Sequence, residues 1–359
     1  MQGGPSVTSR RHLLTLGLAA PLWPLRSLAV ESALLLFPRD LGSHPDYAIE
    51  WWYVTGRVLS GRREFGFQLT FFRSRVPATQ GMTSAFAAKQ LVFAHAAVTD
   101  VAGRRLWHDQ RIAREGFGIA QASATDSDLK LRDWTLRRNG THYQARAVAR
   151  DFSFQLDLKE TQALLLQGDR GVSRKGPQPE QSSFYYSLPQ LQVTGTLSLG
   201  KESLPVQGAA WLDHEWSQSL LDPLAVGWDW IGINLLDGSA LTAFQMRDKS
   251  GQAIWDGGSF RAGASGARSQ VFARGEIRFV ALRQWTSPST KANYPVEWTL
   301  QTPLGSYRVR GVIDNQELDS RASTGAVYWE GLSELFDSAD QLVGRGYLEM
   351  TGYAGALRF

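Results

Sequence analysis

The stretch EFGFQLTFF, from Glu64 to Phe72, decides the fold class of this chain. Its apolar residues share one face of an extended strand, and they are Phe65, Phe67, Leu69 and Phe71. Because successive side chains of a β-strand point to opposite faces, this alternation predicts a strand with one face against a core. The same alternation recurs at 191–199 and at 294–301, whereas helical periodicity is scarce.

Turn signals separate these segments at short intervals, among them Ser60-Gly61, Asn139-Gly140 and Asp237-Gly238. Many short antiparallel strands joined by tight turns are typical of sandwiches and up-and-down barrels. A chain of 359 residues, 43% of them hydrophobic, is large enough for two cores. We therefore predict an all-β protein with two consecutive lipocalin-like antiparallel β-barrel domains, at residues 37–218 and 219–359, after a cleavable N-terminal signal.

The N-terminus has the pattern of an export signal. Residues 9–14 read SRRHLL, a twin-arginine signature, an apolar stretch covers 13–23, and small residues follow at 27–29. The apolar stretch is too short for a permanent membrane span. We predict a twin-arginine signal peptide over residues 1–29 and a periplasmic or secreted protein, the alternative being a merely basic leader.

Charge and cysteine content exclude several classes of function. Removing residues 1–29 removes three arginines and no acid, so the formal charge falls from +4 to +1. Such a protein lacks the clustered positive charge that nucleic-acid binding requires. The chain has no cysteine, which rules out disulfides, thiol chemistry and cysteine-ligated metals.

The segment AWLDHEWSQSLLDPLAVGWDW, residues 210–230, combines four tryptophans with four acids and one histidine. Acids are rarely fully buried unless paired, so the mixture predicts polar groups inside an aromatic-walled cavity. Burial raises the proton affinity of a carboxyl and suits it to general acid catalysis, and indole faces stabilise a cation. The candidate catalytic residues are Asp213, His214, Glu215 and Asp229. The alternative is structural, with hydrogen bonds among these groups joining the two barrels.

Other segments supply candidate walls for this cavity. We interpret residues 167–189, rich in Gly, Pro, Ser and Gln, as a long loop that crosses the cavity mouth and brings Lys175, Tyr185 and Tyr186 near it, the alternative being a flexible surface excursion. The candidate substrate-binding residues are aromatic, and they are Trp52, Trp211, Trp216, Trp228, Trp230, Tyr185 and Tyr186. The segments 328–331 and 345–353 are expected to close the second barrel by core packing.

Metal and nucleophile signatures are absent from the sequence. The histidines at 44, 95 and 214 could converge with Glu50 or Asp213, but none has the close spacing of zinc motifs. His95, alone on an apolar strand, is expected to be a hydrogen-bonded core residue. No Gly-x-Ser-x-Gly elbow occurs. We expect no metal and no cofactor.

A series of motifs gives a family resemblance over nearly the whole chain after the signal. In order they are HPDYAIEWWYVTG, FGFQLTFFR, AHAAVTD, GVSRKG, YYSLP, AWLDHEW, GWDWIGINLLDG, YPVEWTL, YWEG and GYLEMTGY. The chain resembles the carotenoid 1,2-hydratase (hydroxyneurosporene synthase) and AttH family, which implies two lipocalin-like barrels. The hydratase branch adds water to acyclic carotenoids, and the AttH branch contains exported proteins. The twin-arginine leader and the HEW and GWDW motifs are closer to the AttH branch.

The resemblance implies a hydratase site at the positions matching Asp213 to Trp216, with an acid on a nearby strand of the second domain. The candidate strand at 240–246, ALTAFQM, contains no acid, so Asp213, Glu215 or Asp229 would supply the proton. Two functions follow. One is an exported hydro-lyase acting on an apolar isoprenoid or lipid-like molecule. The other is a carrier of such a ligand that serves an inner-membrane ABC-type transporter. A secreted hydrolase rests on the family label alone.

Overall fold

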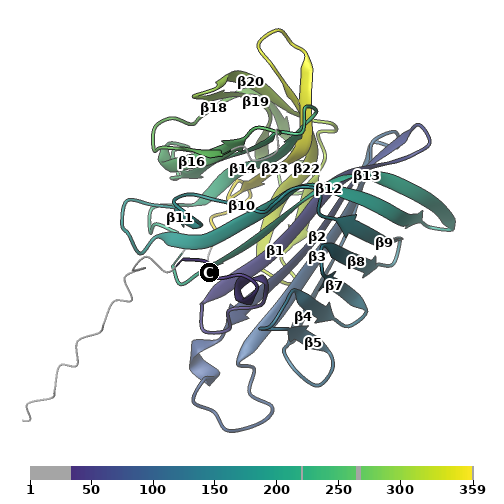
Figure 1. Ribbon diagram of the computed structural model, residues 1–359, viewed down its shortest axis with the longest axis vertical. Helices are drawn as coiled ribbons and strands as arrows, with labels where there is room; N and C mark the ends of the chain where they lie inside the picture. The colour runs from purple at the N-terminus through teal and green to yellow at the C-terminus, as the bar shows by residue number, and fades with distance from the viewer. Residues whose placement is uncertain (1–33, 220, 264–267, 358–359) are drawn as a thin grey trace, which may run out of the picture.

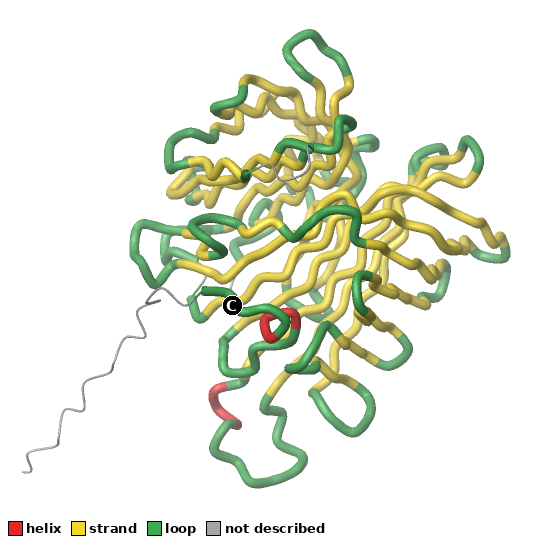
Figure 2. The backbone as a smooth tube through the Cα atoms, in the orientation of Figure 1, coloured by secondary structure: helices red, strands yellow, loops and turns green. Residues whose placement is uncertain are grey.

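The structure is a computed structural model that describes residues 34–219, 221–263 and 268–357. Strands dominate these residues, and helix is confined to the short 3-10 segments η1 (Arg39–Leu41) and η2 (Pro77–Thr79) (Figure 2). The signal predicted at 1–29 lies outside the described residues. Across the part of the chain that is described, no helix has the length and apolar character needed to cross a membrane.

The first sheet contains thirteen antiparallel strands within the described residues. They are β1 (Ile49–Ser60), β2 (Arg63–Arg75), β3 (Gln90–Asp100), β4 (Arg105–Arg114), β5 (Ala120–Ala122), β6 (Asp128–Leu131), β7 (Trp134–Asn139), β8 (His142–Val148), β9 (Phe152–Lys159), β10 (Leu165–Leu166), β11 (Val172–Arg174), β12 (Ser182–Leu199) and β13 (Glu202–Ser217). The main path runs β4-β3-β2-β1-β13-β12-β9-β8-β7-β6-β5. The sheet curls until β3 and β4 contact β6, which almost closes a barrel (Figure 1).

The second sheet contains ten strands in the same described ranges. They are β14 (Gly227–Leu235), β15 (Ala240–Arg247), β16 (Ala253–Arg261), β17 (Ser269–Phe272), β18 (Arg278–Thr286), β19 (Asn293–Thr302), β20 (Gly305–Gly311), β21 (Glu317–Ser320), β22 (Ala326–Phe336) and β23 (Leu342–Thr351). The main path runs β17-β16-β15-β14-β23-β22-β20-β19-β18. The first sheet ends at Ser217 and the second begins at Gly227.

Each sheet surrounds its own apolar core, as the alternation predicts. In β2 the four residues of the apolar face are fully buried in the first core, and in β19 the residues from Tyr294 to Leu300 alternate into the second. The prediction of an all-β protein with two lipocalin-like units is therefore confirmed, and the first unit is the more nearly closed.

The segment at 167–189 differs from the predicted long loop. Gly168 and Gly171 adopt positive φ angles, a conformation that glycine tolerates, and they form a tight turn before β11. β11 then pairs with the start of β12. The glycines thus shape the tight turn between β10 and β11, both of which pair with β12, and Tyr185 and Tyr186 are strand residues.

A third apolar cluster joins the two sheets. It contains Tyr53 and Trp211 from the first sheet with Trp230, Leu332 and Tyr347 from the second. The strands in contact across the interface are chiefly β1, β2, β12 and β13 on one side and β14, β22 and β23 on the other. A pocket in this interface is therefore walled by both sheets.

Candidate active site between the two sheets

A pocket of about 720 Å³, counting the space at its mouth that is open to solvent, lies in the interface between the sheets. Most of its wall is aromatic or aliphatic, but four carboxylic acids and one lysine line it, namely Asp213, Glu215, Glu330, Glu349 and Lys175. Small-molecule sites are typically concave and mostly apolar with a few convergent polar groups. This pocket fits that description.

Strand alternation decides which side chains reach the pocket. On β13, Asp213 and Glu215 face it, and their register partners on β1 are Tyr53 and Trp51. The intervening residue His214 points to the opposite face, into the interior of the first sheet. The chain therefore alternates between a pocket wall and a barrel core along the same two strands.

Glu330 and Glu349 form the acidic floor of the pocket. They are register partners on β22 and β23, and Glu330 is 2% exposed. Burial raises the pKa of Glu349 to about 8, and the charges of Asp213 and Glu215 act in the same direction. Burial and the neighbouring Glu349 raise the pKa of Glu330 well above its usual range. Two opposed carboxyls in a desolvated site cannot both ionise readily, so the pair retains a proton near neutral pH.

Hydrogen bonds fix the orientation of this pair. Gln68 of β2 donates its side-chain amide to Glu330. The side chain of Trp228 hydrogen-bonds to Glu349. The first sheet thus holds one carboxyl and the second sheet the other.

Asp213 is a third acid with an elevated proton affinity. Burial raises its pKa to about 7, although hydrogen bonds from Ser187 and Trp211 act in the opposite direction. The Ser187 hydroxyl lies 2.5 Å from Oδ1 and the Trp211 indole nitrogen 2.7 Å. A carboxyl with a pKa near neutral can act as an acid or a base.

Glu215 is paired, unlike the other three acids. The Lys175 Nζ lies 3.0 Å from Oε1 of Glu215, and Ser183 donates to the same oxygen. Nζ also lies 4.2 Å from the ring centroid of Phe244 and 4.9 Å from that of Tyr185. Ring faces and the carboxylate together stabilise this buried cation.

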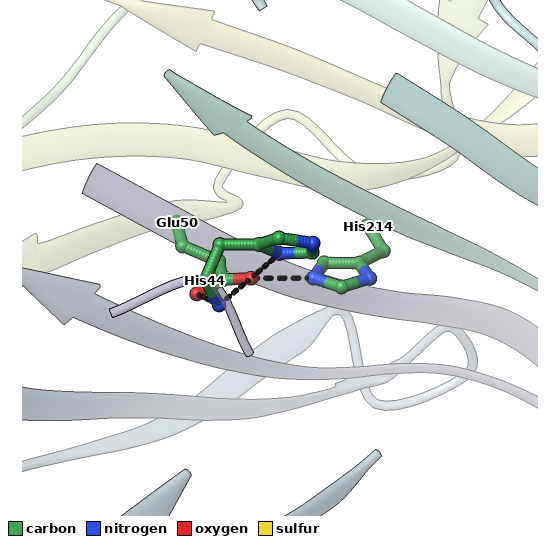
Figure 3. A group of neighbouring side chains, drawn as sticks. All are labelled: His44, Glu50 and His214. Carbon is green, nitrogen blue, oxygen red and sulfur yellow. Dashed lines mark hydrogen bonds and ion pairs between the residues drawn. The ribbon is translucent and has the colours of Figure 1, made fainter. Parts of the chain in front are cut away.

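A second polar cluster lies on the other face of β1 and β13, inside the first sheet (Figure 3). Oε1 of Glu50 lies 2.7 Å from Nδ1 of His44 and 2.8 Å from Nε2 of His214. Oε2 lies 2.8 Å from Nε of Arg73. The rings are stacked on indoles, His44 on Trp216 and His214 on Trp52.

The pKa values in this cluster favour an ionised glutamate. Burial alone would raise the pKa of Glu50, but hydrogen bonds from His214 and His44 outweigh it and hold the pKa well below its usual range. Burial lowers the pKa of His214 to about 4, so its imidazole is neutral near pH 7. For His44, hydrogen bonds to Asp40 and Glu50 outweigh burial and raise the pKa.

This cluster has the donor set of a zinc site, because one oxygen of Glu50 and one nitrogen each of His44 and His214 lie within 4.8 Å of one another. Both nitrogens, however, hydrogen-bond directly to that one oxygen, and Arg73 and Ser43 bond to the other. The carboxylate is therefore saturated by hydrogen bonds. We interpret the cluster as the structural clamp that holds residues 43–50 to the barrel.

The structure separates the predicted site residues into four places, of which the interior of the second sheet, with Asp229, is the last. The pocket receives Asp213, Glu215, Trp228, Trp230, Lys175 and Tyr185. The first barrel interior holds His214, Trp52, Trp216 and Tyr186, because these residues fall on the inward face of their strands. Trp211 lies in the interface core, beside the pocket and not in its wall.

Asp229 is directed into the second sheet and away from the pocket. Its carboxylate accepts hydrogen bonds from Arg247 and Gln245, each at 2.7 Å, and from Tyr353 at 3.0 Å. It is opposed to Trp228 and Trp230 on β14, as alternation predicts, and this direction removes it from the pocket. His95 is also remote from the Glu50 cluster, since its Nε2 lies 2.9 Å from the Ser323 hydroxyl.

Sequence reasoning assigned the strands of Glu330 and Glu349 to core packing, whereas both acids line the pocket. The sequence contained a signal for a pocket position. Each acid shares a strand face with an aromatic residue two positions earlier, Tyr328 for Glu330 and Tyr347 for Glu349. An acid on the apolar face of a strand needs a partner or a cavity.

The fold and the site together define the class of protein. It is an all-β protein of two curled sheets, with carboxylic acids in an aromatic pocket between them. The sequence model of the AttH-like family matches residues 29–353, and the chain belongs to this family. No curated protein matches the chain significantly.

Solved structures include one close homologue from the same family and more distant proteins that share the fold. A crystal structure of a candidate AttH protein from Nitrosomonas europaea is 45% identical, covers 90% of this chain and 99% of its own, and superposes with a TM-score of 0.84. Kievitone hydratase from Nectria haematococca shares the fold at 13% identity, with 90% and 94% coverage and a TM-score of 0.70. CghA does so at 12% identity, with 91% and 94% coverage and a TM-score of 0.53.

Proposed function

We propose that this protein is a hydro-lyase that adds or removes water at a C=C bond of an apolar, isoprenoid or lipid-like molecule in the pocket. One observation carries the proposal, namely the opposed carboxyls of Glu330 and Glu349 beneath aromatic walls. A proton held in a desolvated, apolar pocket suits general acid catalysis on an uncharged substrate. The name of one structural neighbour, a hydratase, agrees with this class of reaction.

In the hydration direction, the protonated member of the pair gives its proton to one alkene carbon. The π electrons form the new C–H bond and leave a cation on the other carbon. The oxygen of a water molecule bonds to that carbon, and the water then loses a proton to the carboxylate that has just been formed. The acid is restored, and one molecule of water has been added.

The surrounding residues support this step. Trp51, Trp228 and Trp230 line the pocket, and an indole face turned to the substrate would stabilise a transient cation. Asp213, with its pKa near 7, is a second group able to accept the proton from water. The ion pair of Lys175 and Glu215 is close to neutral as a unit and leaves the acid pair as the proton source.

The test uses the purified full chain with lycopene or neurosporene in water enriched in heavy oxygen. Mass spectrometry should show an alcohol product that has gained one labelled water. Because removing a general acid lowers rates about 10²- to 10⁴-fold, Glu349→Gln or Glu330→Gln should lower turnover by that factor and preserve binding. Glu180→Gln, at an exposed position outside the pocket, is the matched control.

The carrier hypothesis predicts the opposite pattern. A native lipid would co-purify, no polyene would be hydrated, and the acid variants would bind the ligand as tightly as the unchanged protein. That outcome would remove the hydro-lyase proposal and favour delivery of the ligand to a membrane transporter.

We also propose that the protein acts outside the cytoplasm, supported by the twin-arginine pattern at residues 9–14. Replacing Arg10 and Arg11 by lysine should retain the protein in the cytoplasm. Cell fractionation of the native host measures this, and unchanged export would contradict the proposal.

A further inference from the structure

The hydroxyl of Tyr53 is a buried donor without a partner. Tyr53 lines the pocket, is 5% exposed, and its hydroxyl makes no hydrogen bond in the described part of the chain. Its ring packs edge-on against Trp230 with centroids 5.6 Å apart, which fixes its direction. Leaving a buried hydroxyl without a partner is unfavourable, and because Tyr53 lines the pocket, a bound group that accepts its hydrogen would remove that cost.

The position of Tyr53 relates this donor to the proposed chemistry. Its register partner on β13 is Asp213. Burial, followed by the charges of Glu330 and Glu349, raises its pKa well above 10. The hydroxyl therefore stays protonated, and it lies close enough to the acid pair for their charges to act on it.

The carboxyl groups and the lysine of the pocket already have partners within the protein. Lys175 is paired with Glu215, Glu330 accepts from Gln68, and Asp213 accepts from Ser187 and Trp211. A pure hydrocarbon would bury the Tyr53 hydroxyl without a partner, whereas an oxygen-bearing ligand would satisfy it. A site built to hydrogen-bond an oxygen discriminates against analogues that lack it.

We propose that the pocket selects an unsaturated isoprenoid or lipid-like molecule that carries an acceptor oxygen, such as a carbonyl, and that Tyr53 donates a hydrogen bond to this oxygen. Tyr53 is then the residue that determines specificity for oxygenated ligands over hydrocarbons. This inference rests on the proposed function, because it assumes that the unsaturated ligand occupies the same pocket.

The experiment compares two matched probes, geranylacetone and the hydrocarbon in which a methylene group replaces its carbonyl. Quenching of tryptophan fluorescence measures the two dissociation constants for the full chain. One hydrogen bond to a buried donor corresponds to about a tenfold preference for the ketone. Tyr53→Phe should abolish that preference by weakening ketone binding and leaving hydrocarbon binding unchanged.

The control is Tyr143→Phe, which removes a hydroxyl from a tyrosine buried in the core of the first sheet, outside the pocket. It should retain the preference for the ketone. Equal binding of both probes, or a preference that survives Tyr53→Phe, would overturn the inference. Equal binding together with hydration of the hydrocarbon would overturn the inference alone and leave the proposed function in place. If neither probe binds and no polyene is hydrated, both fail.

Discussion

Glu330 and Glu349 occupy directly opposed positions on β22 and β23, and both line the pocket, Glu330 buried and Glu349 half-buried. Like charges directly opposite each other destabilise a sheet, and burial adds a desolvation cost. The folded protein avoids both costs by retaining a proton that the unfolded chain would release.

Stability should therefore depend on pH through this pair. Between pH 4.5, the ordinary value for Glu349, and its folded-state pKa of about 8, the unfolded chain has released the proton and the folded chain keeps it. The stability from this group is complete below pH 4.5 and is lost as the pH rises to 8. Urea unfolding at pH 5.5 and 8.5 should show a smaller decrease in Glu349→Gln than in the unchanged protein, by at least about 1 kcal/mol. Equal decreases in both proteins would contradict this assignment.

Turnover should fall at high pH for the same reason. Glu349 loses its proton as the pH rises through about 8, so kcat/KM for hydration should decrease above that value. Initial rates between pH 6 and 10, measured where circular dichroism shows the fold intact, test this. A rate that keeps rising to pH 10 would point to a base as the essential group.

Glu50 should be important for stability and not for chemistry. Its carboxylate is the buried partner of Arg73, and Glu50→Gln leaves that guanidinium without a countercharge. Breaking a buried ion pair at one end costs about 3–5 kcal/mol. Urea unfolding should show this loss, whereas Glu202→Gln, which removes the exposed partner of Arg63, should cost less than about 1 kcal/mol.

Gly66 should be required for the contact between the sheets. A Cβ at this position would lie 2.7 Å from the Tyr347 hydroxyl and 2.9 Å from Cβ of Leu332, both in the second sheet. Gly66→Ala should therefore destabilise the protein by about 1–3 kcal/mol through overpacking. Gly81→Ala is the control, because nothing lies within 4 Å of a Cβ there. Matching melting temperatures for the two variants would show that the interface adjusts freely.

The local pattern of apolar and polar residues determined where the strands lie and which face of each strand is buried. Alternation in β2 and β19 identified the core residues, and alternation in β13 correctly separated Asp213 and Glu215 from His214. These results follow from the two-residue period of an extended chain, which is a local property and can be read from the sequence. The long loop predicted over residues 167–189 is instead a tight turn at Gly168 and Gly171 followed by β11 and the start of β12, because a tight turn and a long loop share the same composition.

Only the tertiary structure decided which residues from distant strands each strand face contacts. Nothing in the sequence placed Glu330 and Glu349 beside Asp213, because β22 and β23 reach the pocket only after the second sheet has folded against the first. In the same way, Glu50, Arg73 and His214 come together only through the pairing of β1 with β2 and β13. Proton affinities depend on burial and on charges from distant segments, so the acid pair and the unpartnered Tyr53 hydroxyl are properties of the assembled interface.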